Sequence, residues 1–283
     1  MKKRTDKLSK FRTTYNAHKT QIPTLQRLTL QTNKVIGTLS PDVQKLPFFL
    51  RQNVDFNLYA LADLNESLVK MLEANRTCSV EALARVATEQ AVNLIYVIES
   101  ESDDRAKSVI SRHLAKSTEN AECWLKFANL HGLDESTQSA KKKLQHLQYW
   151  KGLLDENQQL KSIETWPLST KKRFSIVGLE NLYHTIFSAS SDAIHGFHED
   201  IFNSTILHYY PDEIRDDAFG NYLVEKQSFA IFLAAYSVAL YIQALYSLAI
   251  RVNAQDAGEK LKDMLEVANA LISTHENDHK QMT

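Results

Sequence analysis

Four polar residues are spaced along one predicted helix so that their side chains could act together. Arg85, Glu89 and Asn93 follow one another at intervals of four residues, and Tyr96 comes three residues later. Because a helix turns once in about 3.6 residues, this spacing puts all four near one stripe. A guanidinium on such a stripe can hold an anion, and a nearby carboxylate can orient it.

A second stretch offers acid–base chemistry. Ser191 and His195 are one helical turn apart, and Tyr183 precedes them on the same spacing of four. Asp192, three residues before His195, could orient the imidazole. We therefore name His195, Arg85 and Glu89 as candidate catalytic residues. Asn93, Tyr96, Ser191, Tyr183 and Asp192 are candidate binding residues.

Both stretches also allow a purely structural interpretation. Glu81, Thr88 and Glu99 extend the polar side of the first helix, so the stripe could face solvent. If it faces inward, Arg85 and its carboxylate must pair with each other or with an outside partner. His195 could likewise serve as a capping or core histidine. The residue pattern alone leaves these alternatives open.

The composition predicts an all-α protein, a large irregular multi-helix bundle with a central apolar helix. The chain has 283 residues, of which only 7 are glycine and 5 are proline. Proline is absent from Phe48 to Trp166 and again after Pro211. We divide the chain into a basic arm with the first helix, residues 1–40, and a single helical domain, residues 41–283.

The helices that position these residues can be placed approximately. Ser40, Pro41 and Asp42 predict a helix start, and Gly132 predicts a helix end. Trp166–Pro167 and Tyr209–Pro211 predict interruptions. The expected helices span residues 41–75, 80–99, 103–116, 119–130, 137–163, 170–196, 216–252 and 256–273.

The segment from Gln227 to Ile250 contains no charged side chain and is long enough to cross a bilayer. Its tyrosines lie in the middle rather than at the two ends, where membrane helices carry their aromatic residues. Because the other predicted helices are amphipathic and need a core, we favour a central bundle helix over a membrane span.

Charge and cysteine content narrow the class of protein. The formal net charge is −1, which argues against a wholly basic nucleic-acid binder, although the first 20 residues are strongly basic. The two cysteines form neither a metal quartet nor a disulfide framework. No apolar core follows the basic start, so we expect no secretory signal and a cytoplasmic location. No cofactor or metal is indicated.

Two short motifs match known enzymes only superficially. His275–His279 reads H-E-x-x-H, but the sequence supplies no downstream third zinc ligand. Arg12 and His18 have the spacing found in small helical ribonucleases of the HEPN type, but we expect them in a frayed basic arm. An equivalent pair could be assembled in space from Arg85 and His195.

The two polar stretches resemble those of a mostly bacterial, all-helical family known only as a domain of unknown function. The resemblance rests on Arg85-x3-Glu89-x3-Asn93-x2-Tyr96, Arg105-Ala106-Lys107, Tyr183 and Ser191-x3-His195-Gly196. It extends roughly from Val54 to Ile250. It implies soluble helices and a shared pocket of Arg, Glu, Asn, Ser and His, and it favours an inward-facing stripe. It implies no particular reaction.

Three functions remain in competition. The first is a ligand-binding or regulatory module, with Arg85 anchoring a small anion, Asn93 and Tyr96 orienting it, and His195 donating a hydrogen bond. The second is a metal-independent RNA-cleaving enzyme in stress or phage defence, with His195 as acid or base. The third is a structural or interaction protein whose charged helix, residues 137–163, recruits partners. Across these functions the candidate partners are an anionic ligand, RNA or a second copy of the chain.

Overall fold

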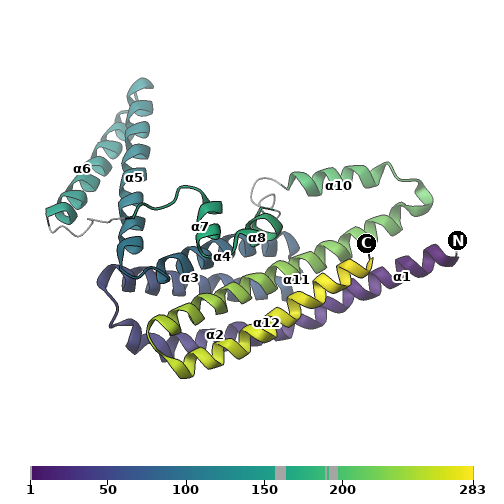
Figure 1. Ribbon diagram of the computed structural model, residues 1–283. Coiled ribbons are helices and arrows are strands. Elements are labelled where there is room, and N and C mark those ends of the chain that lie inside the picture. The colour runs from purple at the N-terminus through teal and green to yellow at the C-terminus, as the bar shows by residue number, and fades with distance from the viewer. Residues whose placement is uncertain (1, 157–163, 189, 191–196, 283) are drawn as a thin grey trace.

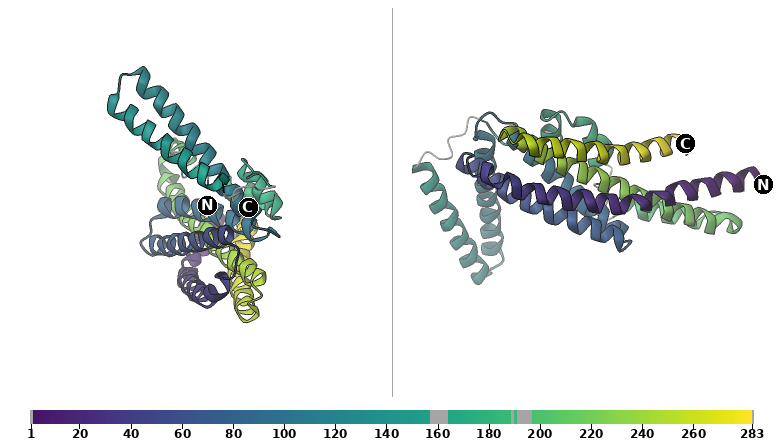
Figure 2. Two further views of the ribbon diagram at one scale, coloured as in Figure 1. Left: turned by 90° about the vertical axis from the view of Figure 1, so that its left-hand side faces the viewer. Right: turned by 90° about the horizontal axis from the view of Figure 1, so that it is seen from below.

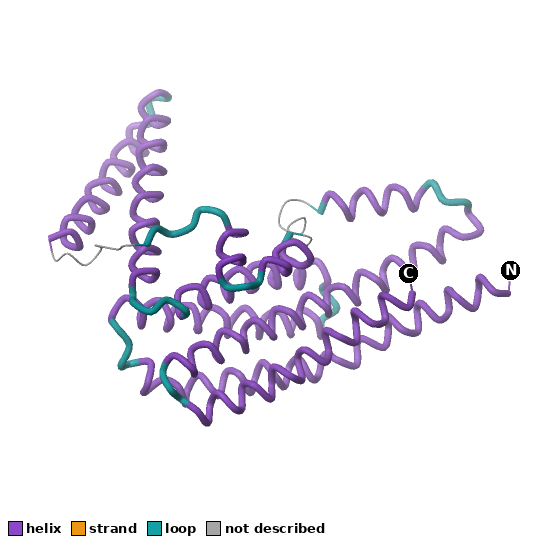
Figure 3. The backbone as a smooth tube through the Cα atoms, in the orientation of Figure 1, coloured by secondary structure: helices purple, strands orange, loops and turns teal. Residues whose placement is uncertain are grey.

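The computed structural model describes residues 2–156, 164–188, 190 and 197–282. Throughout these residues the regular elements are helices, and no strand occurs (Figure 3). The predicted all-α class is therefore confirmed. Both termini lie at one end of the elongated bundle, and a helical hairpin stands out from the other end (Figures 1 and 2).

The body of the bundle is built around one long helix, α11 (Asp212–Arg251). It contacts helices from both ends of the sequence, which lie beside it in Figure 1. These neighbours are α1 (Lys2–Ala17), α2 (Ile22–Val43), α3 (Phe48–Glu73), α4 (Thr77–Ile98) and α12 (Gln255–Met282). A short 3-10 turn, η1 (His18–Gln21), joins α1 to α2.

The apolar sequence of α11 is explained by its central position. By length and composition this helix could cross a membrane, with a mean hydropathy of 1.8 over its most apolar window. In the structure, however, 78% of that window is buried inside the protein. A helix that is apolar on all sides suits the centre of a bundle, as predicted for this segment.

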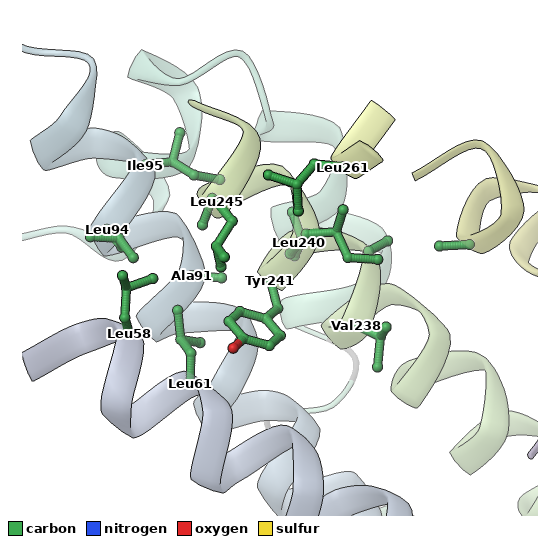
Figure 4. Packing of buried hydrophobic residues seen from close by; sticks show 14 of the residues in the cluster. Leu58, Leu61, Ala91, Leu94, Ile95, Val238, Leu240, Tyr241, Leu245 and Leu261 are labelled. Atoms are coloured by element: carbon green, nitrogen blue, oxygen red, sulfur yellow. The ribbon is translucent and has the colours of Figure 1, made fainter. Parts of the chain in front are cut away.

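Side chains from α3, α4 and α12 pack against those of α11 (Figure 4). Leu61 of α3, Leu94 of α4 and Leu261 of α12 are fully buried together with Leu245 of α11. Burial of each such leucine contributes about 1.5–3 kcal/mol relative to exposure. A polar group among them is paired, since the buried Tyr241 hydroxyl donates to Asn33 Oδ1 at 2.7 Å.

The projecting hairpin consists of α5 (Asp104–Leu130) and α6 (Asp134–Glu156). Gly132 ends α5 with a left-handed backbone, φ +62°, which confirms the predicted stop. The predicted break at residues 117–118 is wrong, because α5 is continuous. The helix accommodates Thr118 because the threonine hydroxyl donates to the Leu114 carbonyl at 2.9 Å, within the helix itself.

Two other predicted boundaries are wrong. The helix start at Ser40–Asp42 does not exist, because Pro41 lies inside the last turn of α2, where one missing hydrogen bond is tolerated. The helix that we expected from residue 170 to 196 stops after α7 (Thr170–Ile176). Gly178 has φ +72°, and Leu179 N donates to Phe174 O at 2.8 Å, which closes the helix end.

Three further elements follow α7. They are α8 (Glu180–Leu182), the π-helix η2 (Tyr183–Phe187) and α10 (His198–His208). Figure 1 shows α10 running along the first part of α11, at the end of the bundle where the termini lie. The predicted interruptions at Trp166–Pro167 and Tyr209–Pro211 are confirmed as loops on either side of this region.

Candidate functional site

The predicted polar stripe on α4 faces α7 and the loop that precedes it. Arg85 is 9% exposed and Tyr96 is 2% exposed, so both lie inside the protein. Arg85 Nη1 donates to Glu89 Oε2 at 2.9 Å, one helical turn away. The stripe is therefore not the solvent-facing side of an amphipathic helix.

Arg173 of α7, which the sequence analysis did not single out, connects the members of the stripe. Its Nε donates to Asn93 Oδ1 at 2.7 Å, and its Nη2 donates to Glu89 Oε1 at 2.9 Å. Nη1 donates to the Pro167 carbonyl at 2.8 Å. Burial lowers the pKa of Arg173, and the Glu89 carboxylate opposes that effect, so the guanidinium keeps its charge.

Tyr96 takes part through its ring and its backbone. Its ring meets the Trp166 ring edge to face, with centroids 5.3 Å apart. The guanidinium of Arg105 lies over the Tyr96 ring at 4.3 Å and donates from Nη1 to the Tyr96 carbonyl at 2.8 Å. Arg105 also pairs with Glu164 at 2.9 Å. These contacts fix the loop before α7 against α4.

The other face of Arg85 lies on an aromatic cluster. Arg85 Cζ is 3.1 Å from the centroid of the Phe187 ring. Phe187 stacks with Tyr183 and packs against Phe174, so the predicted residue Tyr183 reaches Arg85 only through Phe187. Arg85 Nε is buried and has no hydrogen-bond partner among the described residues.

We call Arg85, Glu89, Asn93 and Arg173 the arginine cluster. Of the predicted site residues, the structure brings Arg85, Glu89, Asn93 and Tyr96 together around α7. Ser191, Asp192 and His195 lie outside the described residues. The pairing of Arg85 with His195 therefore stays a prediction. Within the cluster, the single carboxylate of Glu89 pairs with both guanidinium groups, and any anion at Arg85 would have to compete with it.

A cavity of about 450 Å³ lies elsewhere in the bundle, between the first helices and the last one. The sequence analysis did not predict it. Its wall comes from α1, η1, α4, α10, α11 and α12. The lining residues are Tyr15, His18, Glu81, Glu199, Asp200, Asn203, Tyr222, Glu225, Lys226, Ser228, Phe229, Phe232, His275, Glu276 and His279. We call this space the terminal cavity.

A hydrogen-bonded network forms the buried side of the terminal cavity. His18 Nδ1 lies 2.6 Å from Ser228 Oγ, and His18 Nε2 lies 3.0 Å from the Asp278 carboxylate. His275 Nε2 lies 3.0 Å from Gln21 Oε1, so this nitrogen carries the proton that the amide oxygen accepts. The two imidazole rings lie close together, with centroids 3.8 Å apart and planes tilted by 47°.

The environment of His275 keeps its imidazole neutral. Burial lowers the pKa of His275 to about 3, with a smaller contribution from the neighbouring His18. A neutral His275 can donate to Gln21 and accept from the Ser228 hydroxyl, 3.5 Å away. The cavity floor is therefore polar without adding positive charge at this position.

Lys226 ties α10 to the bundle at the other side of the cavity. Its Nζ lies 3.0 Å from Glu81 Oε1 of α4 and is also ion-paired with Asp200 of α10. Burial lowers the pKa of Lys226, but the hydrogen bonds to Asp200 and Glu81 outweigh it, so the net pKa is raised. Tyr222 donates to Asp200 Oδ1 at 2.7 Å. The ammonium is thus held by two carboxylates.

The residues of the terminal cavity did carry signals in the sequence. His275 and His279 belong to the H-E-x-x-H motif, and His18 belongs to the Arg12-x5-His18 pair. The structure places His275 and His18 together, whereas Arg12 bonds instead to Asn221, from Nε to Oδ1 at 2.6 Å. Among the described residues, no group of three His, Cys, Asp or Glu side chains is arranged to hold a metal ion.

The fold and these two sites define an all-helical protein with a buried arginine cluster and a separate polar–aromatic cavity. The chain belongs to a family described as Family of unknown function (DUF5677), whose model matches residues 59–213, more than half of the chain. The match confirms the predicted resemblance, although it ends well before Ile250. No curated protein and no solved structure matches the chain.

Proposed function

We propose that the protein is a ligand-binding module and that its ligand occupies the terminal cavity. The observation that carries this proposal is the cavity itself, about 450 Å³, where aromatic side chains meet a buried polar network. Sites for small molecules usually measure about 300–1,000 Å³ and combine apolar walls with a few fixed polar groups. The phenylalanine walls and the His18–Ser228 pair supply both.

The geometry of the arginine cluster supports a positioning role for it. An anion at Arg85 would have to compete with Glu89, whose two carboxylate oxygens hold Arg85 and Arg173 at 2.9 Å each. Breaking such a buried pair leaves an uncompensated charge behind. We therefore assign Arg85, Glu89, Asn93 and Arg173 to holding α7 on α4, and place ligand binding at the terminal cavity.

The experiment is a thermal-shift screen of a broad small-molecule library, followed by calorimetry on each compound that raises the melting temperature. A ligand at 100 times its Kd stabilises the folded state by about 2.7 kcal/mol. Asn203→Trp, which fills the cavity from α10, should abolish the shift. Ser204→Trp, at the next position on α10 and outside the lining, is the matched control and should retain it.

Two results would contradict the proposal. One is a screen in which no compound stabilises the wild-type protein. The other is a set of compounds whose shifts survive in Asn203→Trp and disappear in Arg85→Ala, which would move the site to the arginine cluster.

A second candidate function is RNA cleavage at Arg85 and His195. The observation that favours it is Arg85 Nε, which is buried without a partner among the described residues and could contact a phosphate oxygen. This proposal predicts that His195→Ala abolishes cleavage of a fluorescent RNA substrate while the far-UV spectrum stays unchanged. Equal cleavage, or no cleavage, by wild type and variant would end it.

A further inference from the structure

We infer that the terminal cavity takes a small organic cation that carries an apolar portion. This inference rests on the proposed function and specifies the chemical class of its ligand. Neither the predicted anion site at Arg85 nor the family match points to such a ligand. Three features of the described lining support the inference, namely its charge, its aromatic rings and its neutral histidine.

The described lining contains far more negative than positive charge. Five carboxylates face the cavity, from Glu81, Glu199, Asp200, Glu225 and Glu276, against the single ammonium of Lys226. Lys226 is already ion-paired with both Glu81 and Asp200, so an anionic ligand would have to compete with two carboxylates for its ammonium group. An anion entering here would meet like charges in a partly desolvated space, where repulsion is stronger than in water.

Glu225 is the cavity carboxylate whose charge acts on a neighbouring side chain, Tyr15. The pKa of Tyr15 is raised, first by burial and then by the negative charge of Glu225. Glu225 therefore lies close enough to the Tyr15 phenol to act on it electrostatically. A cationic ligand in the cavity would be attracted by this carboxylate. The more exposed position of Glu225 also puts it where an incoming ligand first meets the cavity.

Aromatic rings supply the second feature. Tyr15, Tyr222, Phe229 and Phe232 all line the cavity. Aromatic ring faces attract cations, by about 0.5–1 kcal/mol at exposed sites and about 2 kcal/mol when the cation is desolvated. The rings also bury methyl or methylene groups. Carboxylates alone would suit a hydrated metal ion, whereas carboxylates combined with these rings suit an ammonium group attached to carbon.

The buried histidine supplies the third feature. A protonated imidazole on the floor would repel a cationic ligand, but burial holds the pKa of His275 near 3, so the ring is neutral at physiological pH. Because its Nε2 proton is directed to Gln21, the ring adds polarity without positive charge. The floor is therefore compatible with a cation in the space above it.

The test compares cations with neutral molecules of nearly the same shape. The probes are choline against 3,3-dimethyl-1-butanol, and butylamine against 1-butanol, each titrated by calorimetry into the full-length protein. We expect at least one cation to bind at least tenfold more tightly than its neutral counterpart. Glu225→Gln should weaken that binding about three- to tenfold, and added salt should weaken it further.

Glu259→Gln is the matched control, because it removes the same charge from an exposed position on α12 outside the cavity. Its affinity should stay within twofold of wild type. Equal affinities for cation and neutral isostere, no binding of either cation, or wild-type affinity in Glu225→Gln would overturn the inference. The proposed function would survive each of these results if the library screen yields a neutral or anionic ligand that Asn203→Trp excludes.

Discussion

The arginine cluster and the terminal cavity both bury charged side chains, and they differ in how those charges are balanced. In the arginine cluster, Arg85 and Arg173 share the carboxylate of Glu89, and Asn93 accepts from Arg173. In the terminal cavity, five carboxylates face one ammonium and a space of about 450 Å³. In the first region a carboxylate lies between two guanidinium groups, whereas in the second several carboxylates line an open volume.

This difference separates a structural role from a binding role. Buried charges must find partners, and in the arginine cluster the carboxylate of Glu89 bridges two guanidinium groups and so holds neighbouring elements together. A set that leaves an excess of one sign beside a cavity is suited to a ligand of the opposite sign. Arg173 and Glu89 therefore explain how α7 is held, and Glu225 and its neighbours explain what the protein could bind.

The largest expected effect lies in the arginine cluster. Arg173→Ala removes the guanidinium that joins Glu89 and Asn93 to the loop before α7. We expect the free energy of unfolding, measured by urea denaturation, to fall by about 3–5 kcal/mol, since one member of a buried pair is deleted. Lys172→Ala, at an exposed neighbour on α7, should cost less than about 0.5 kcal/mol.

A loss below about 1 kcal/mol in Arg173→Ala would show that the arginine cluster does not hold α7. It would reopen that cluster as a functional site and break the contrast between the two regions.

The next largest effect concerns how the free energy of unfolding depends on pH, through His275 in the terminal cavity. The folded-state pKa of His275 is about 3, below its ordinary value of 6.5, so the unfolded chain binds more protons between these values. The stabilisation from neutral His275 is complete above pH 6.5 and is lost as the pH falls toward 3. The expected slope is up to about 1.4 kcal/mol per pH unit in that window.

His275→Gln tests this slope, because glutamine keeps polar atoms near Gln21 and Ser228 but does not titrate. Urea denaturation between pH 6.5 and 4 should show a shallower loss of stability in His275→Gln than in wild type. His146→Gln, at an exposed position on α6, should keep the wild-type slope. Identical slopes in wild type and His275→Gln would mean that the cavity floor is solvated and that the imidazole is not held neutral.

The smallest effect concerns the attachment of α10. Tyr222→Phe deletes the hydroxyl that donates to Asp200 at 2.7 Å and leaves the Lys226–Asp200 ion pair in place. We expect a loss of about 1 kcal/mol in unfolding free energy, typical of one hydrogen bond whose acceptor keeps another partner. Tyr59→Phe, at a 75% exposed position, should cause no measurable change. Equal effects of the two substitutions would argue that α10 does not depend on this bond.

The fold was largely predictable because its signals are local. Long proline-free amphipathic stretches and the charge-free segment around Tyr241 predict helices and a central helix, and the structure contains both. The errors occur where tertiary contacts override local preference. Pro41 is accepted in the last turn of α2, and Gly178 ends a helix that periodicity would continue.

The two regions differ in predictability for the same reason. The spacing of Arg85, Glu89 and Asn93 is visible along one helix, so the arginine cluster could be found in part, but its partner Arg173 lies 84 residues from Glu89. The terminal cavity draws its wall from helices at both ends of the chain, and its His18–Ser228 bond joins residues 210 positions apart. No local pattern in the sequence predicts that such distant residues come into contact.

The most direct measurement is a crystal structure of the protein soaked with whichever cation, choline or butylamine, binds more tightly in solution. We predict ligand density in the terminal cavity, with the ammonium group near Glu225 and its carbon atoms against Phe229, while the Arg85–Glu89–Arg173 contacts stay unchanged. Density over Arg85 and Phe187, or an empty terminal cavity at saturating ligand, would contradict the assignment of the two regions.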